Sequence, residues 1–181
     1  MRKYVAWISI FMLFFVLTDP ASAFLFGKDK ETKEIEAKAR KILENAVFIS
    51  MSTKLDVNVP ELSYNKRKKT LTATICLGDI NNKYMPLGGA GFFGDRYGKA
   101  QWYLFNRIYD LYSKIPQLEL CCFLIKFPGY VRKDNFETEA VWKDSFYIEF
   151  SRKTYEKFDW EQKLKGHALY IAADKCEVFD D

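Results

Sequence analysis

The chain has 181 residues, a formal net charge of +4 and a single histidine. One histidine excludes a histidine-rich metal site, and so small a positive charge gives no nucleic-acid footprint. Aromatic residues make up 17% of the chain, which predicts either an aromatic-rich core or an aromatic binding groove.

The first 23 residues have the pattern of a secretory signal peptide. Arg2 and Lys3 precede an apolar run over residues 5–17, and residues 21–23 form an A-x-A cleavage site. The run is shorter than the roughly 20 residues of a spanning helix, so we expect no integral membrane span in the mature chain. Cleavage removes two cations and one anion and leaves 158 residues with a charge of +3, which is the size of one domain. We expect export to the periplasm or the extracellular space.

After a loose lead-in at residues 24–30, a helix is predicted from Asp29 to about residues 48–51. Ile35, Ala39 and Ile42 recur at helical spacing, Asp29 is the candidate N-cap, and Glu31 suits the first turn.

A β-hairpin is predicted next. Residues 55–64 and 71–77 alternate between apolar and polar side chains, and a short polar segment separates them. Pro60 limits the first strand to a sheet edge or ends it, and residues 62–64 resume it in the first case. The basic run at residues 66–69 could bind an anionic surface, but a solvated hairpin tip is the commoner outcome.

Residues 78–98 hold six of the nine glycines, including a literal G-x-G-x-x-G at residues 89–94. A dinucleotide fingerprint must follow directly on a strand and open a helix, whereas here the strand ends near Leu77 and the helix begins near residues 95–99. We therefore predict no nucleotide and no cofactor. The loop either packs its phenylalanines on the core or forms a partner surface, and the candidate binding residues are Phe92, Phe93, Asp95, Arg96 and Tyr97.

The second half repeats the order of helix and hairpin. An apolar stripe predicts a helix from Trp102 to Ile115, ended by Pro116. Residues 118–127 are apolar on both faces, which indicates a central strand covered on both sides. A loop is expected at residues 128–139, followed by a strand at 141–150.

The C-terminal region is predicted to form a helix and an acidic tail. Asp159 with Gln162 resembles a capping box, and Trp160, Leu164 and Ile171 share one helical face with His167 and Ala168. Residues 177–181 form the tail.

These elements predict an α+β fold in a single small domain, residues 24–181. We expect an antiparallel or mixed sheet of about four strands, arranged as two hairpins and packed by about three helices.

Four cysteines in an exported chain indicate disulfide bonds. Neighbouring cysteines on a strand point to opposite faces, so one of the adjacent pair could reach Cys76 and the other Cys176. One bridge with two buried thiols, or four free thiols, are the alternatives. The disulfide candidates are Cys76, Cys121, Cys122 and Cys176.

No catalytic constellation stands out. Cys121 or Cys122 could act as a nucleophile with His167 as base, but the strand is expected to be buried and His167 lies on an apolar helical face. Asp134, Glu137 and Glu139 could hold Ca²⁺, although a solvated loop is the commoner outcome. We expect no metal.

The sequence therefore favours an exported, non-catalytic α+β domain that binds a protein or a cell-envelope component. An exported hydrolase that uses carboxylates or a cysteine with His167 is the first alternative. A secreted inhibitor or immunity-type protein is the second, with residues 78–98 as the inserting element.

Overall fold

The computed structural model describes residues 29–45, 47–48, 54–80, 96–133, 138–161 and 168–179. The chain divides into two compact units, Met1–Glu34 and Ile35–Asp181. The first unit contributes only residues 29–34 to the described part, and all other described residues belong to the second unit.

Helix α2 (Lys30–Leu43) begins where the sequence predicts. The Asp29 carboxylate accepts a hydrogen bond from the Thr32 backbone N–H at 2.9 Å, which confirms Asp29 as the N-cap. The helix ends earlier than expected, because residues 47–48 leave the helical path and form strand β1 (Val47–Phe48), which pairs with β2 (Lys54–Leu55).

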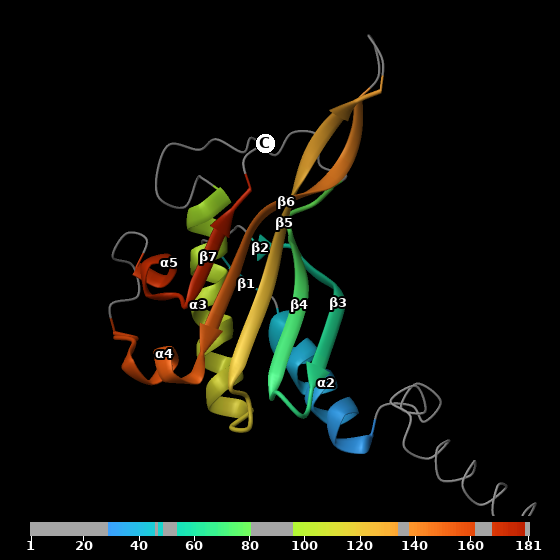
Figure 1. Ribbon diagram of the computed structural model, residues 1–181. Coiled ribbons are helices and arrows are strands. Elements are labelled where there is room, and N and C mark those ends of the chain that lie inside the picture. The colour runs from blue at the N-terminus through green and yellow to red at the C-terminus, as the bar shows by residue number, and fades with distance from the viewer. Residues whose placement is uncertain are drawn as a thin grey trace, which may run out of the picture. The chain divides into compact units, whose positions relative to one another are not determined.

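A single mixed five-stranded sheet forms the centre of the second unit (Figure 1). The strand order follows the chain order, β3-β4-β5-β6-β7. Strands β4 and β5 are parallel because the connection between them includes helix α3 (Arg96–Lys114); the other neighbours are antiparallel. The strands are β3 (Val57–Asn65), β4 (Thr70–Leu77), β5 (Leu120–Arg132), β6 (Thr138–Ser151) and β7 (Lys175–Val178). The α+β prediction is confirmed, with five strands in this sheet rather than about four.

The hairpin of β3 and β4 forms as predicted. Asn65 accepts a hydrogen bond from the Lys68 N–H at 3.0 Å, and Lys69 adopts a left-handed conformation with φ of 51°. Pro60 lies in the outer strand β3, beside a register shift between Asn58 and Glu61, as an edge strand allows.

The hairpin of β5 and β6 is longer than the sequence suggests. Strand β5 continues through Pro128 and Gly129, where a loop was expected. The pairing with β4 ends at Lys126, so beyond it β5 has β6 alone as a described partner. The missing N–H of Pro128 therefore removes no bond to β4.

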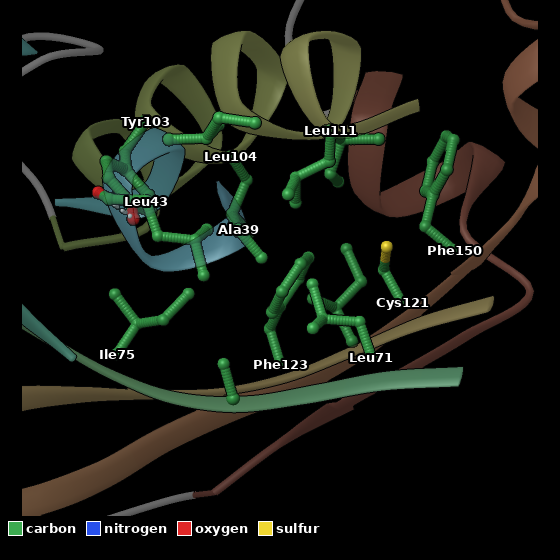
Figure 2. Packing of buried hydrophobic residues seen from close by; sticks show 14 of the residues in the cluster. Ala39, Leu43, Leu71, Ile75, Tyr103, Leu104, Leu111, Cys121, Phe123 and Phe150 are labelled. Atoms are coloured by element: carbon green, nitrogen blue, oxygen red, sulfur yellow. Dashed lines mark hydrogen bonds between the residues drawn. The ribbon is translucent and has the colours of Figure 1, made fainter. Parts of the chain in front are cut away.

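Helices α2 and α3 pack on one face of this sheet (Figure 2). Tyr103 is fully buried and its hydroxyl donates to the Leu43 carbonyl at 2.8 Å, which joins the two helices. The side chains that meet in this layer come from α2, α3, β4, β5 and β6, and include Ala39, Leu43, Leu71, Ile75, Tyr103, Leu104, Leu111, Cys121, Phe123 and Phe150. The other face of β5 is only partly covered, because Leu120, Leu124 and Lys126 remain partly exposed. The prediction that both faces are covered is wrong there.

The C-terminal region differs most from the prediction. Helix α4 (Arg152–Lys157) starts directly after β6, because the Ser151 side chain accepts a hydrogen bond from the Thr154 N–H at 3.2 Å. Helix α5 (Ala168–Ala172) is short, and residues 162–167 lie outside the described part. Residues 175–178 pair with β6 as the fifth strand. The predicted acidic tail, residues 177–181, therefore begins inside a strand.

Candidate functional site: an aromatic pocket beside Trp160

An aromatic cluster surrounds Trp160, between helix α3 and the segment that follows α4. The Trp160 ring lies close to four other aromatic rings. The distances between ring centroids are 4.7 Å to Phe158, 5.0 Å to Phe105, 5.1 Å to Tyr155 and 5.5 Å to Tyr109. The indole N–H donates to the Tyr155 carbonyl at 2.8 Å, so its polar atom is satisfied.

The sequence builds this cluster from two local patterns. Phe105, Tyr109 and Tyr112 recur at helical spacing on α3, so their rings lie along one side of the helix. Tyr155 stacks on Tyr112, with the ring centroids 4.9 Å apart. The chain then leaves α4 in an extended conformation at Phe158, whose φ and ψ are −74° and 132°. This turn away from the helix brings Trp160 back onto the α3 rings.

A pocket of about 290 Å³ opens beside this cluster. Among the described residues, its lining consists of Phe105, Asn106, Tyr109, Trp160 and Glu161. Tyr109 is 47% exposed, although its ring belongs to the cluster. Apolar rings with a few polar groups at the margin are typical of a ligand site.

Two polar side chains, Asn106 and Glu161, lie among the aromatic residues that line the pocket. Asn106 donates its side-chain N–H to the Trp102 carbonyl at 2.8 Å, which holds the amide against the helix. The Glu161 side chain is exposed and adds a carboxylate to the lining. An apolar or aromatic group fits such a lining, and a cation next to that group would meet Glu161.

The adjacent cysteines point to opposite faces of β5, as predicted. Cys121 is fully buried on the core face, opposite Phe150 on β6 and Leu71 on β4. Burial raises its thiol pKa to about 12, against the lowering effect of the Tyr112 hydroxyl. A thiol that stays protonated is a poor nucleophile, so the environment of Cys121 opposes cysteine catalysis.

Cys122 lies on the opposite face with Tyr147 and Glu149. The Tyr147 hydroxyl donates to the Glu149 carboxylate at 2.7 Å and also lies beside the thiol. Burial raises the pKa of Cys122, the hydrogen bond with Tyr147 lowers it, and the Glu149 charge raises it; the net direction is upward. This group is a satisfied polar network rather than an activated thiolate.

The expected disulfide bonds do not form: all four cysteines, each within the described residues, are free. Cys76 lies opposite Lys126 on β5. Lys126 is five positions after Cys121, so about 16 Å along the strand separates Cys76 from the level of Cys121. Cys176 lies on β7, two strands from β5, and is exposed. Disulfide geometry requires Cα atoms within about 7 Å, so the sheet register keeps these thiols apart.

The predicted binding loop is largely beyond the described part of the chain. Phe92, Phe93 and Asp95 lie outside it, and Arg96 and Tyr97 are present as the first two residues of α3. The onset of α3 at Arg96 agrees with the predicted helix start. His167 also lies outside the described residues, so its proposed partnership with Cys121 or Cys122 is untested.

The candidate calcium loop is divided in the same way. Asp134 and Glu137 lie outside the described residues, and Glu139 forms an ion pair with Lys133 at 3.0 Å. Among the described residues, no group of three or more histidine, cysteine or carboxylate side chains could hold a metal ion. Within the same residues, no helix is long and apolar enough to cross a membrane.

The apolar stripe of α3 predicted a helix, but no sequence pattern predicted the pocket. The available signal was the concentration of aromatic residues at 155, 158 and 160, directly after the second hairpin. Only Trp160 was predicted to lie on a helix, one starting at Asp159. That prediction gave no reason to expect the three rings on the same side of the chain. Comparisons with protein-family models, curated proteins and solved structures gave no match to this chain.

Proposed function

We propose that this protein is a non-catalytic binding domain that takes an apolar side chain of a partner protein into the pocket beside Trp160. The observation that carries the proposal is the pocket of about 290 Å³ beside partly exposed aromatic rings. A volume near 300 Å³ suits a single large side chain better than an extended ligand. Tyrosine and tryptophan are also the residue types that dominate protein-binding hot spots.

The cellular setting is part of the same proposal. The charged start, short apolar run and A-x-A site of residues 1–23 favour export, so we propose a partner in the periplasm or outside the cell, either a protein or a protein component of the envelope. Glu161 in the pocket lining favours a partner residue that has a basic neighbour.

The test compares binding by the wild type with that of two variants. Tyr109→Ser removes an exposed ring from the pocket. Val131→Ser removes an equally exposed apolar side chain from the end of β5 that pairs with β6 alone among the described strands. Both residues are 47% exposed. The purified proteins serve as bait in an envelope extract, and the affinity of the recovered partner is measured by calorimetry. We expect Tyr109→Ser to weaken binding at least about tenfold, because hot-spot rings contribute about 2 kcal/mol or more.

Val131→Ser should bind as the wild type does. Circular dichroism and thermal melting establish that both variants are folded. Equal binding by all three proteins, or equal loss in the two variants, would contradict a role for the pocket. Intrinsic fluorescence gives a second measurement, since a side chain that enters the pocket contacts the Trp160 ring.

A further inference from the structure

Strand β7 forms one outer edge of the sheet. It pairs with β6 through four residue pairs, from Phe146 with Val178 to Glu149 with Lys175, and no described strand lies on its other side. Figure 1 shows β7 at the outer side of the sheet next to β6. All four residues of β7 are exposed. An exposed edge presents backbone N–H and C=O groups that can pair with a strand from another chain.

The edge is short and carries charged residues, but it lacks two other features that prevent such pairing. Strand β7 contains no proline, and its register with β6 has no shift. It has two charged side chains, Lys175 and Glu177, but these have opposite signs and form an ion pair with each other at 2.9 Å. Opposite charges on an edge repel a second copy only in some registers.

The sequence Lys175-Cys176-Glu177 is self-complementary about its central residue. We propose that β7 pairs antiparallel with β7 of a second copy, about a two-fold axis at Cys176, and joins the two five-stranded sheets into one. In this register each Lys175 lies opposite Glu177 of the other copy, and Cys176 lies opposite its own copy. The pairing therefore creates two symmetric cross-strand ion pairs.

The neighbouring symmetric registers are disfavoured. A two-fold axis between antiparallel strands is perpendicular to the sheet, so residues of one face can pair only with residues of the same face. A shift to the next allowed register in one direction places Lys175 opposite Lys175 of the other copy. A shift in the other direction places Glu177 opposite Glu177 of the other copy. Like charges directly opposite one another destabilise a strand pair.

Apolar side chains next to the edge would add buried area. Among the described residues, five large hydrophobic side chains are exposed, and three of them lie in the last two elements or directly after them: Ile171, Val178 and Phe179, at 83%, 52% and 40% exposure. Four paired residues alone bury less surface than a specific dimer needs, so these neighbours supply the remainder of the interface.

The test begins with the purified chain under reducing conditions. We expect sedimentation equilibrium to show a dimer of the wild type that survives Cys176→Ser, because the pairing does not require a covalent bond. Addition of diamide, an azo compound that takes up the two thiol hydrogens, should give a covalent dimer of the wild type and none of Cys176→Ser. Opposed Cα atoms in antiparallel strands lie about 4.5–5.5 Å apart, which is within disulfide reach.

Charge reversal tests the register. Lys175→Glu makes both positions acidic and Glu177→Lys makes both basic, so each variant alone should dimerise at least about tenfold more weakly than the wild type. An equimolar mixture should recover dimerisation, since each acidic strand then faces a basic one. Thermal melting of each variant checks that the monomer is folded. Lys133→Glu, at an exposed site directly after β5, is the matched control.

A wild type that remains monomeric at about 100 µM, far above the dissociation constants of stable dimers, would overturn the proposal and leave the edge for a strand of a different protein. A dimer that is indifferent to both charge reversals would place the interface elsewhere and overturn it as well. Either result is separate from the pocket, because no residue of β7 lines it.

Discussion

The two outer strands of the sheet, β3 and β7, meet their surroundings in different ways. Side chains of α2 cover the free edge of β3: the Arg40 guanidinium donates to the Val59 carbonyl at 2.5 Å, and the Glu36 carboxylate accepts from the Tyr64 N–H at 2.9 Å. Pro60 and a register shift interrupt the same edge. Strand β7 has neither a proline nor a register shift.

The strands are also anchored differently. In β3, Val59 and Tyr64 are 0% and 7% exposed, so the strand is part of the core. In β7 all four residues are exposed, and the strand is held mainly by its pairing with β6 and by Asp174 just before it. In one molecule, helix side chains therefore cover the backbone edge of β3, whereas the backbone edge of β7 has no such cover among the described residues.

The largest expected effect comes from the anchors. Val59→Ala should lower the free energy of unfolding by about 2 kcal/mol, because it removes buried methyl groups and leaves a cavity. Val178→Ala should cost less than about 0.5 kcal/mol, since Val178 is 52% exposed. Urea unfolding at a protein concentration that keeps the chain monomeric measures both values. Equal losses would contradict the difference in anchoring.

The second prediction concerns the cover of β3. Arg40→Ala removes the hydrogen bond to the Val59 carbonyl and should cost about 0.5–1 kcal/mol, while the adjacent and exposed Lys41→Ala should be nearly neutral. Denaturant unfolding compares the two. Arg40→Ala also uncovers part of the β3 edge, so we expect the variant to self-associate more than the wild type, as measured by light scattering. Equal stability and equal self-association of the two proteins would show that α2 does not protect this edge.

A third effect depends on pH and on the attachment of β7. Burial opposes ionisation of Asp174, but hydrogen bonds from Thr154 and Ser151 outweigh it, so its pKa is lowered from 3.8. A lowered native pKa gives stability that is present above the unfolded value and is lost as pH falls below about 3.8 towards the native value. We expect faster amide exchange in β7 over that interval, measured by mass spectrometry.

Asp174→Asn is the matched variant for this experiment. It should remove the acid-dependent part of the exchange in β7 and leave the exchange of β3 unchanged, because no hydrogen bond of Asp174 reaches that strand. If the wild type and the variant show the same pH dependence in β7, Asp174 does not hold the strand.

The smallest expected effect is a difference in the labelling rates of Cys176 and Cys121, which involves no substitution and no change in the free energy of unfolding. Cys176 is exposed and should react first with an aromatic disulfide reagent under native, monomeric conditions. Cys121 is fully buried with its pKa raised to about 12, so it should react only on unfolding. Mass spectrometry of the labelled peptides gives the order. Early labelling of Cys121 would mean that the core face of β5 opens readily.

Local patterns predicted much of the fold. Helical spacing located α2 and α3, and alternation located β3, β4 and β6, because these periods reflect burial of one side of each element. A continuous apolar run located β5. The predictions failed where an element depends on distant partners. Strand β7 alternates charged and apolar residues over only four positions and runs into the acidic residues predicted as a tail, and it is ordered through its pairing with β6. The binding loop and His167 lie outside the described residues, so those predictions stand as they were.

Local sequence patterns were enough to predict the capping of α2 at Asp29 and the opposite orientation of Cys121 and Cys122, because each follows from spacing within one element. The order of the predicted elements was enough for the α+β class. Long-range packing sets which thiols are near each other, where the aromatic rings meet and which sheet edge is covered. Those features depend on strand register and helix packing, which join residues far apart in the chain. The free cysteines, the pocket at Trp160 and the open edge at β7 are all products of that long-range arrangement.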